Sequence, residues 1–395
     1  MTVARRCLLA GAALAALLAP VPALAVDTLQ IRRPGHVLFD HDARAAKLAA
    51  APMERRIAAC RARDMARGPV KPVRRLQETS GYGGDNAAEP FTWAVMDLSG
   101  EFLATGDPAT GRAAAAQLLA WAEAGALLRT GDLDDASTVF SIKRLALPVI
   151  QAYAVLEGRG ALTPQESARL RGWLDALVRL ADRTFGDNAT ADRNNHRYLR
   201  DAVNAAWGAA TGDAARFALG VTRYVEALDQ MRPDGSWPLE ARRGARALWY
   251  MRQSIATLVA IAEIAATQGY DLYAVQRDGR DLHLALKYTL DAMDDPRLIL
   301  GYAEENYIPG PSDDWRRQDM GFLEIRINKR HYMAWAEAYL RRFPDHPNSA
   351  RLRALMERAG VFAARPLIDD FSGGNGTCFW AGLQPASPNV SQTNQ

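Results

Sequence analysis

The chain has few cysteines, little net charge and scarcely any strand-like alternation of polar and apolar residues. Three cysteines in 395 residues exclude a disulfide-rich small scaffold. The six histidines show no paired metal-ligand spacing, so we expect no transition metal and no other cofactor. Beyond the N-terminal leader we expect no stretch that is long and apolar enough to span a bilayer. The 49% hydrophobic content is typical of a globular protein with one large core.

The first 25 residues are typical of a cleavable secretory signal peptide. Arg5 and Arg6 precede an apolar run that is too short for a comfortable membrane span, and Ala23-Leu24-Ala25 ends it with a cleavage pattern. Cleavage there predicts a soluble, periplasmic or secreted chain that starts at Val26.

Processing also changes the charge and the cysteine content. Removing the two leader arginines from the formal net charge of +3 leaves +1, so only a local cluster of cations can attract a polyanion. Cys60 and Cys378 remain. An exported compartment permits a disulfide that joins the two ends of the chain, and the alternative is two buried free thiols.

Helical periodicity dominates residues 86–339. The alanine-rich residues 111–128 carry large side chains at helical intervals. Thr163-Pro164-Gln165-Glu166 predicts a capped helix start, and residues 241–266 predict another helix, which Gly269 ends. The sequence therefore predicts an all-α protein.

No linker divides the helical region. We expect one catalytic domain over residues 26–385, followed by a frayed polar tail over residues 386–395. Helix pairs without a sheet can close as a bundle, a solenoid or an α/α toroid, and periodicity does not choose among these.

The densest polar cluster is residues 192–198, just before an amphipathic segment. Asn195, His196 and Arg197 at a helix start can hydrogen-bond a carboxylate, and the helix N-terminus adds positive potential. The alternative is an asparagine cap followed by a solvated charged turn.

A second cluster spans residues 240–250. Arg243 and Tyr250 are seven positions apart, which predicts that they share one face of a helix, with Glu240 one turn before Arg243. A guanidinium can hold a substrate carboxylate while a neighbouring phenol exchanges protons. The alternative is an arginine that covers a buried tyrosine.

These clusters resemble the alginate lyase family, whose members cleave poly-β-D-mannuronate, and a related group of lyases that act on β-1,4-linked glucuronate. The resemblance extends over most of the chain and rests on Pro72-Val73-Arg74, on residues 194–198, on residues 240–250 and on residues 334–339. It implies an incomplete α/α toroid of antiparallel helix pairs and a metal-independent β-elimination.

The resemblance also implies roles for individual residues. Asn195 and Arg243 would neutralise the C5 carboxylate, His196 would neutralise it or act as base, and Tyr250 would donate a proton to the leaving O4. Neutralising the carboxylate stabilises the enolate that forms when the adjacent proton is removed. Further substrate-binding residues are predicted from aromatic and charged side chains, for which the alternative is core packing or a surface ion pair: Tyr82, Arg197, Tyr198, Glu240, Arg246 and Trp249.

One residue departs from the family pattern. The family carries a Ser-Lys-Tyr triplet after Pro-Val-Arg, where this chain has Ser80-Gly81-Tyr82. Gly81 cannot supply the lysine cation, which puts subsite preference in doubt. Mannuronate and glucuronate share C4 and C5, so we favour either over guluronate, which is inverted at C5.

We therefore predict a lyase for an acidic, mannuronate- or glucuronate-containing polysaccharide, as a monomer with no nucleic-acid or membrane partner. One alternative is a lyase for β-1,4-glucuronan, and another is a periplasmic polysaccharide-binding protein that has lost turnover. A helical-toroid glycoside hydrolase would need two carboxylates flanking the bond, for which Glu304, Asp313 and Asp314 are loop candidates without a supporting pattern.

Overall fold

The computed structural model describes residues 28–62, 67–76, 87–131, 133–186, 189–306 and 314–383. The predicted signal peptide, the whole predicted polar tail, Gly81 and Tyr82 lie outside these residues. Fifteen α-helices are described. They are α1 (His41–Ala49), α2 (Met53–Cys60), α3 (Glu89–Thr105), α4 (Pro108–Glu123), α5 (Ala136–Gly158), α6 (Pro164–Ala181), α7 (Asn195–Thr211), α8 (Ala214–Gln230), α9 (Pro238–Ala241), α10 (Ala247–Thr267), α11 (Leu282–Asp294), α12 (Arg297–Ala303), α13 (Ala336–Arg342), α14 (Pro347–Arg358) and α15 (Gly376–Trp380).

Short elements connect these helices. Among the described residues the strands are two antiparallel pieces of two residues, β1 (Ile368–Asp369) and β2 (Gly374–Asn375). Six 3₁₀ helices complete the description: η3 (Thr190–Asp192), η4 (Gly244–Arg246), η5 (Gly321–Leu323), η6 (Ile327–Lys329), η7 (Val361–Ala364) and η8 (Asp370–Ser372). The prediction of an all-α protein is confirmed.

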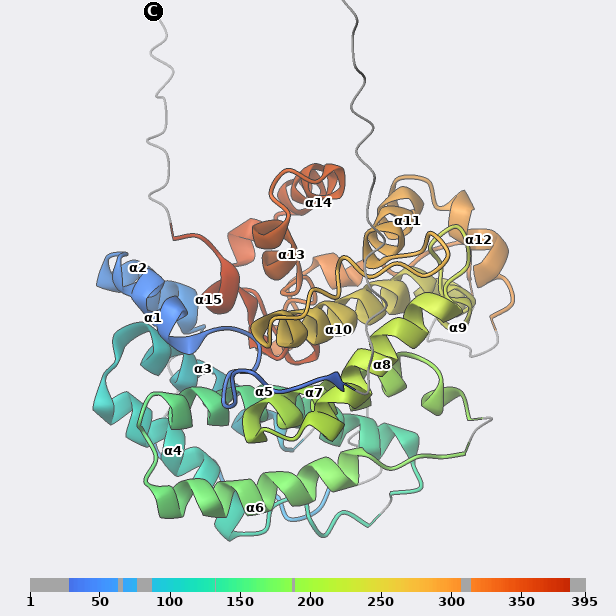
Figure 1. The fold of residues 1–395 in the computed structure, drawn as a ribbon. Coiled ribbons are helices and arrows are strands. Elements are labelled where there is room, and N and C mark those ends of the chain that lie inside the picture. Colours follow the sequence, from blue (N-terminus) through green and yellow to red (C-terminus); the bar gives the residue numbers. More distant parts are fainter. Residues whose placement is uncertain are drawn as a thin grey trace, which may run out of the picture.

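Helices pack as pairs in two layers (Figure 1). The inner helices α3, α5, α7 and α10 pack on one another in chain order, and each pairs with the helix that follows it, α4, α6, α8 or α11. Inner helices are buried nearly all round, whereas α6 and α8 bury one stripe and expose the rest. This is the predicted incomplete α/α toroid.

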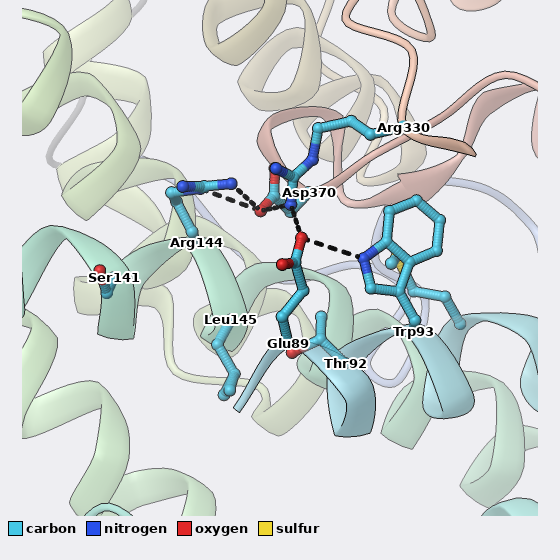
Figure 2. Close-up of a pocket in the computed structure, with 9 residues that line it drawn as sticks. Glu89, Thr92, Trp93, Ser141, Arg144, Leu145, Arg330 and Asp370 are labelled. Atoms are coloured by element: carbon cyan, nitrogen blue, oxygen red, sulfur yellow. Dashed lines mark hydrogen bonds and ion pairs between the residues drawn. The ribbon is translucent and has the colours of Figure 1, made fainter. Parts of the chain in front are cut away.

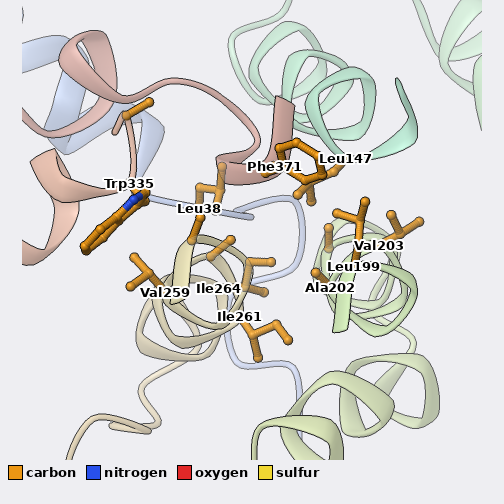
Figure 3. Packing of buried hydrophobic residues seen from close by; sticks show 14 of the residues in the cluster. Leu38, Leu147, Leu199, Ala202, Val203, Val259, Ile261, Ile264, Trp335 and Phe371 are labelled. Carbon is orange, nitrogen blue, oxygen red and sulfur yellow. The ribbon is translucent and has the colours of Figure 1, made fainter. Parts of the chain in front are cut away.

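The core lies between the inner helices (Figure 3). Leu147 of α5, Leu199 of α7 and Ile264 of α10 are each fully buried there, together with Leu38 from the N-terminal segment. Small residues let the helices approach closely. Gly220 of α8, for example, has no room for a Cβ beside Ala205 of α7.

Helix α5 corrects one expectation. By length and composition it could cross a membrane, so the prediction that no segment beyond the leader qualifies is wrong. Its apolar window is wholly buried inside the protein, which is the environment of a core helix.

Helix boundaries follow the predicted signals in two places and depart from them in a third. Thr163 caps α6 and Glu166 closes the capping box, as predicted. Residues 241–266, predicted as one helix, are broken: α9 ends at Ala241, and α10 starts at Ala247 after the turn of η4. Helix α10 ends at Thr267, close to Gly269, which has a φ of +84°.

The two ends of the described chain meet. Helix α15 packs against α2 and α13, and a disulfide joins Cys60 to Cys378 across a sequence separation of 318 residues. The predicted disulfide is thereby confirmed, and the alternative of two free thiols is excluded.

Candidate active site

The N-terminal ends of the inner helices come together on one side of the toroid. His196, in the first turn of α7, stacks on Phe140 in the second turn of α5, with ring centroids 4.0 Å apart. Glu89, the first residue of α3, accepts a hydrogen bond from Arg330, which also reaches Asp370 beside α5. Helix N-termini carry positive potential, so this side suits an anion.

The start of α7 presents Asn195 and His196. Asn194 is the N-cap, and its side chain accepts a hydrogen bond from the His196 backbone N–H at 3.0 Å. The Asn195 backbone N–H donates to Glu240 Oε1 at 2.8 Å. These two contacts satisfy backbone donors of the first turn and fix the direction of both side chains.

The Asn195 side chain is fully buried, yet its amide is unsatisfied. Neither Oδ1 nor Nδ2 has a hydrogen-bond partner within the part of the chain that the structure describes. Leaving such a group unpaired costs about 1–3 kcal/mol. An amide held at this cost beside a helix N-terminus is suited to bind a polar ligand.

Arg243 reaches the site from the break between α9 and α10. Its Nη1 lies 3.7 Å from Glu240 Oε2, beyond hydrogen-bond distance, and neither Nε nor Nη1 donates a hydrogen bond to any described residue. Gly244 makes the break possible, because its φ is +57° and an added Cβ would collide with the Asn306 side chain. Arg243 is 6% exposed, and these two nitrogens are buried donors without a described hydrogen-bond partner.

Tyr250 meets Arg243 as predicted, but by a different route. The Arg243 guanidinium carbon lies 3.6 Å from the centroid of the Tyr250 ring. The two residues do not share a helix face, because Arg243 precedes η4 and Tyr250 lies in the first turn of α10. Tyr250 is half-buried, so of the four predicted catalytic residues it is the most accessible to solvent.

Burial sets the charge of two groups here. It lowers the pKa of His196 well below its usual range, and the positive charges of Lys143 and Arg243 lower it further. The imidazole is therefore neutral at physiological pH. Burial raises the pKa of Glu240 to about 7, against the opposing effects of Arg243 and the Asn195 backbone N–H. This carboxyl is thus close to half-protonated near neutral pH.

The predicted substrate-binding residues occupy different environments. Arg197 donates to Asp201 at 3.0 Å and to the Asp192 carbonyl. Tyr198 is 1% exposed and donates to Gln230, so its phenol stabilises the core. Glu240 is fully buried behind Arg243, as described above.

Two further predicted residues lie at the start of α10. Arg246 is half-buried, with Nε 3.7 Å from an Asp319 carboxylate oxygen. Trp249 is 9% exposed and packs edge-on against Phe322 and Tyr332. The substrate-binding assignments of all these residues stay predictions.

A buried ionic cluster that sequence reasoning missed lies beside the site (Figure 2). Arg144 and Arg330 both donate to Asp370 Oδ2, at 2.9 and 3.0 Å, and Arg330 donates to Glu89 at 2.7 Å. Burial would raise the pKa of Asp370, but the two guanidiniums outweigh it and lower the pKa. These residues line a pocket with Trp93 and Ser141.

This cluster is connected to the histidine through aromatic rings. Phe371 follows Asp370, lies 5.7 Å from the Phe140 ring and receives the Arg144 guanidinium over its face. Phe140 in turn stacks on His196. Arg144 and Asp370 are 226 positions apart in sequence, and no local sequence motif predicts their contact. Among the described residues, no group of three or more histidine, cysteine or carboxylate side chains is arranged to hold a metal ion.

Known proteins resemble this chain in sequence. The alginate lyase family model matches residues 54–299. A polysaccharide lyase of Stenotrophomonas maltophilia is 32% identical over 251 residues, which are 64% of this chain and 69% of that protein. An alginate lyase of Pseudomonas fluorescens is 27% identical over 270 residues, or 66% of this chain and 67% of that protein.

Solved structures extend the likeness to the fold. The crystal structure of alginate lyase A1-III from Sphingomonas species A1 superposes with a TM-score of 0.72 at 25% identity, covering 90% of this chain and 99% of that one. A variant of A1-III complexed with a tetrasaccharide superposes with a TM-score of 0.74 at 23% identity, covering 90% and 98%. The family match spans well over half of the sequence, and the chain belongs to the alginate lyase family.

Proposed function

We propose that the protein is a polysaccharide lyase that cleaves a 1,4-linked polyuronate of the alginate type by β-elimination, with Asn195, His196, Arg243 and Tyr250 as its catalytic residues. The observation that carries the proposal is the pair of buried, uncommitted hydrogen-bond donors on Asn195 and Arg243. An amide and a guanidinium at a helix N-terminus match a substrate carboxylate in charge and geometry.

The reaction explains why such donors are needed. The base removes the C5 proton, the C4–C5 double bond forms, the C4–O4 bond breaks, and O4 leaves with a proton. A proton next to an ionised carboxylate is very weakly acidic. Donors on the carboxylate stabilise the negative charge that develops on it in the transition state, and a single such donor contributes about 10²–10³ in rate.

The environments of His196 and Tyr250 favour different roles. His196 is neutral and buried against Phe140, so it can exchange a hydrogen bond with the substrate without adding a charge. Tyr250 is half-buried, and the Arg243 cation beside its ring attracts negative charge that develops on the phenol. In mannuronate and glucuronate, H5 and O4 lie on the same face of the sugar ring. One phenol can therefore take the proton from C5 and return it to O4.

We propose poly-β-D-mannuronate as the preferred substrate and β-1,4-glucuronan as the second candidate, since both present C4 and C5 identically. The relatives named alginate lyase support the first. We also propose an exported, periplasmic or secreted monomer, because the leader has the pattern of a signal peptide.

The test is an assay of the mature protein on polymannuronate, polyguluronate and glucuronan, following the ultraviolet absorbance of the unsaturated product. Signal on polymannuronate, weaker signal on glucuronan and none on polyguluronate is the expected order. The absence of unsaturated product from every substrate would overturn the proposed function. Hydrolysis without a double bond would indicate a glycoside hydrolase instead.

A further inference from the structure

Lys143 is a buried cation without a hydrogen bond. The residue lies on α5 with 0% of its surface exposed, and its Nζ has no hydrogen-bond partner among the described residues. Lysine is almost never fully buried unless it is paired, because an unpaired ammonium costs several kcal/mol to desolvate. Because the protein retains this cost between two packed helices, we expect the charge of Lys143 to serve a function.

The side chain lies on the face of α5 that meets α7. Lys143 follows Phe140 by three positions, so the two side chains are neighbours on one face of the helix. The Phe140 ring stacks on His196, and α5 packs along α7. The ammonium is therefore placed one helical turn beyond the ring that supports the imidazole.

Carboxylates near Lys143 are already engaged by arginines. Asp201 accepts hydrogen bonds from Arg197, Arg200 and Arg223. None of the described carboxylates lies within ion-pair distance of the Lys143 ammonium. The charged groups that act on it electrostatically are Arg200 and Asp201 of α7, Asp192 of η3 and Asp182 at the end of α6.

The positive charge of Lys143 acts on His196. Burial is the largest cause of the low pKa of the imidazole, and the charges of Lys143 and then Arg243 act in the same direction. No carboxylate among the described residues contributes an opposing effect. Burial lowers the pKa of Lys143 itself to about 8, so the ammonium keeps most of its charge at neutral pH.

We propose that Lys143 is a positioning residue for the elimination, whose buried charge acts from α5, one helical turn from the Phe140 ring, and adds to burial in favouring the neutral form of the stacked His196. The inference rests on the proposed function, because an imidazolium could not accept a hydrogen bond from the substrate. Lys143 acts through His196 and does not touch the sugar.

The decisive variant is Lys143→Met, which keeps an unbranched side chain one atom shorter and removes the charge. Replacing a poorly paired buried charge by an apolar side chain is commonly neutral or stabilising. We expect the variant to unfold at an equal or higher urea concentration. We also expect the acid limb of its kcat/KM profile on polymannuronate to move up by about one pH unit. On the acid limb of the profile, kcat/KM then falls about tenfold, while kcat/KM near pH 8 is unchanged.

Lys287→Met is the matched control. Lys287 is exposed and pairs with Asp291 on the outer helix α11, so this variant loses the same charge far from α5. Its pH profile should equal that of the unmodified protein. Titration of the His196 ring by NMR, assigned by its loss in His196→Ala, gives a readout that does not depend on turnover.

The outcomes separate the two proposals. If the unmodified protein makes no unsaturated product, the proposed function fails. If it is active and the acid limb and the His196 titration are the same in Lys143→Met, the inference about Lys143 fails. An equal shift in Lys287→Met would also overturn it. Lys143→Gln is the second variant, and failure of both variants to fold would assign Lys143 to structure alone.

Discussion

The Arg243 guanidinium lies over the Tyr250 ring, with 3.6 Å between its central carbon and the ring centroid, and two of its buried nitrogens donate no hydrogen bond to a described residue. Stacking uses the face of the guanidinium and leaves its edge for a carboxylate. One side chain can thus hold the substrate and support the phenol at the same time.

Arg243→Lys tests this double use. Lysine retains the charge but offers neither a planar face nor a fork of donors. We expect kcat on polymannuronate to fall by about 10²–10³, with KM also raised. Circular dichroism checks that the fold is intact. Arg242→Lys is a suitable control, because Arg242 pairs with Glu305 at the surface. A lysine variant with full activity would refute the role of the stacked guanidinium.

Tyr250→Phe removes one oxygen atom. If the phenol moves the proton, kcat should fall by about 10²–10⁴. The affinity for mannuronate oligomers should change little, because Asn195 and Arg243 are intact. Steady-state rates and calorimetric titration with a tetramer measure the two quantities. Loss of binding in parallel with loss of turnover would instead identify Tyr250 as a binding residue.

The buried carboxyl of Glu240 should make the free energy of unfolding depend on pH. Burial raises the pKa of its carboxyl from 4.5 to about 7, so the folded protein holds this proton more tightly than the unfolded chain. Its contribution to the free energy of unfolding is complete below pH 4.5 and is lost as the pH rises through 7, by about 3 kcal/mol. Glu240→Gln keeps the acceptor for Asn195 and abolishes the titration. Urea unfolding across this range should show a flatter dependence for the variant, and parallel curves would contradict the assignment.

The disulfide predicts a second effect on stability. Replacing both Cys60 and Cys378 by serine should lower the free energy of unfolding by about 2–5 kcal/mol, because the bond restricts the unfolded chain over a loop of hundreds of residues. Initial rates on polymannuronate at low temperature should be unchanged, since the bond lies between α2 and α15, away from the site. Urea titrations of the double variant and of the reduced protein should agree.

Local signals in the sequence predicted much of the fold. Thr163 and Glu166 gave the capping box of α6, and Asn194 with its neighbours marked the start of α7, because capping depends on residues three positions apart. The break before α10 was missed, since it depends on Gly244 adopting a positive φ against Asn306, which is distant in sequence.

The candidate site was predicted unevenly for the same reason. Asn195, His196, Arg243 and Tyr250 could be named from two short segments and a family likeness. Phe140, Lys143 and the Arg144–Asp370–Arg330 cluster could not, because their partners come from α5 and from residues beyond 329. In an apolar helix such as α5, the role of a buried lysine or arginine can be assigned only when the facing helix is known.

The bond between Cys60 and Cys378 makes the toroid a closed covalent loop, with all four candidate catalytic residues inside it. A protease that cuts any surface loop between the two cysteines therefore opens the loop without releasing a fragment. The cut halves stay tethered and can reassociate around the same core. The tether therefore keeps a cleaved molecule in one piece until a reductant breaks the disulfide.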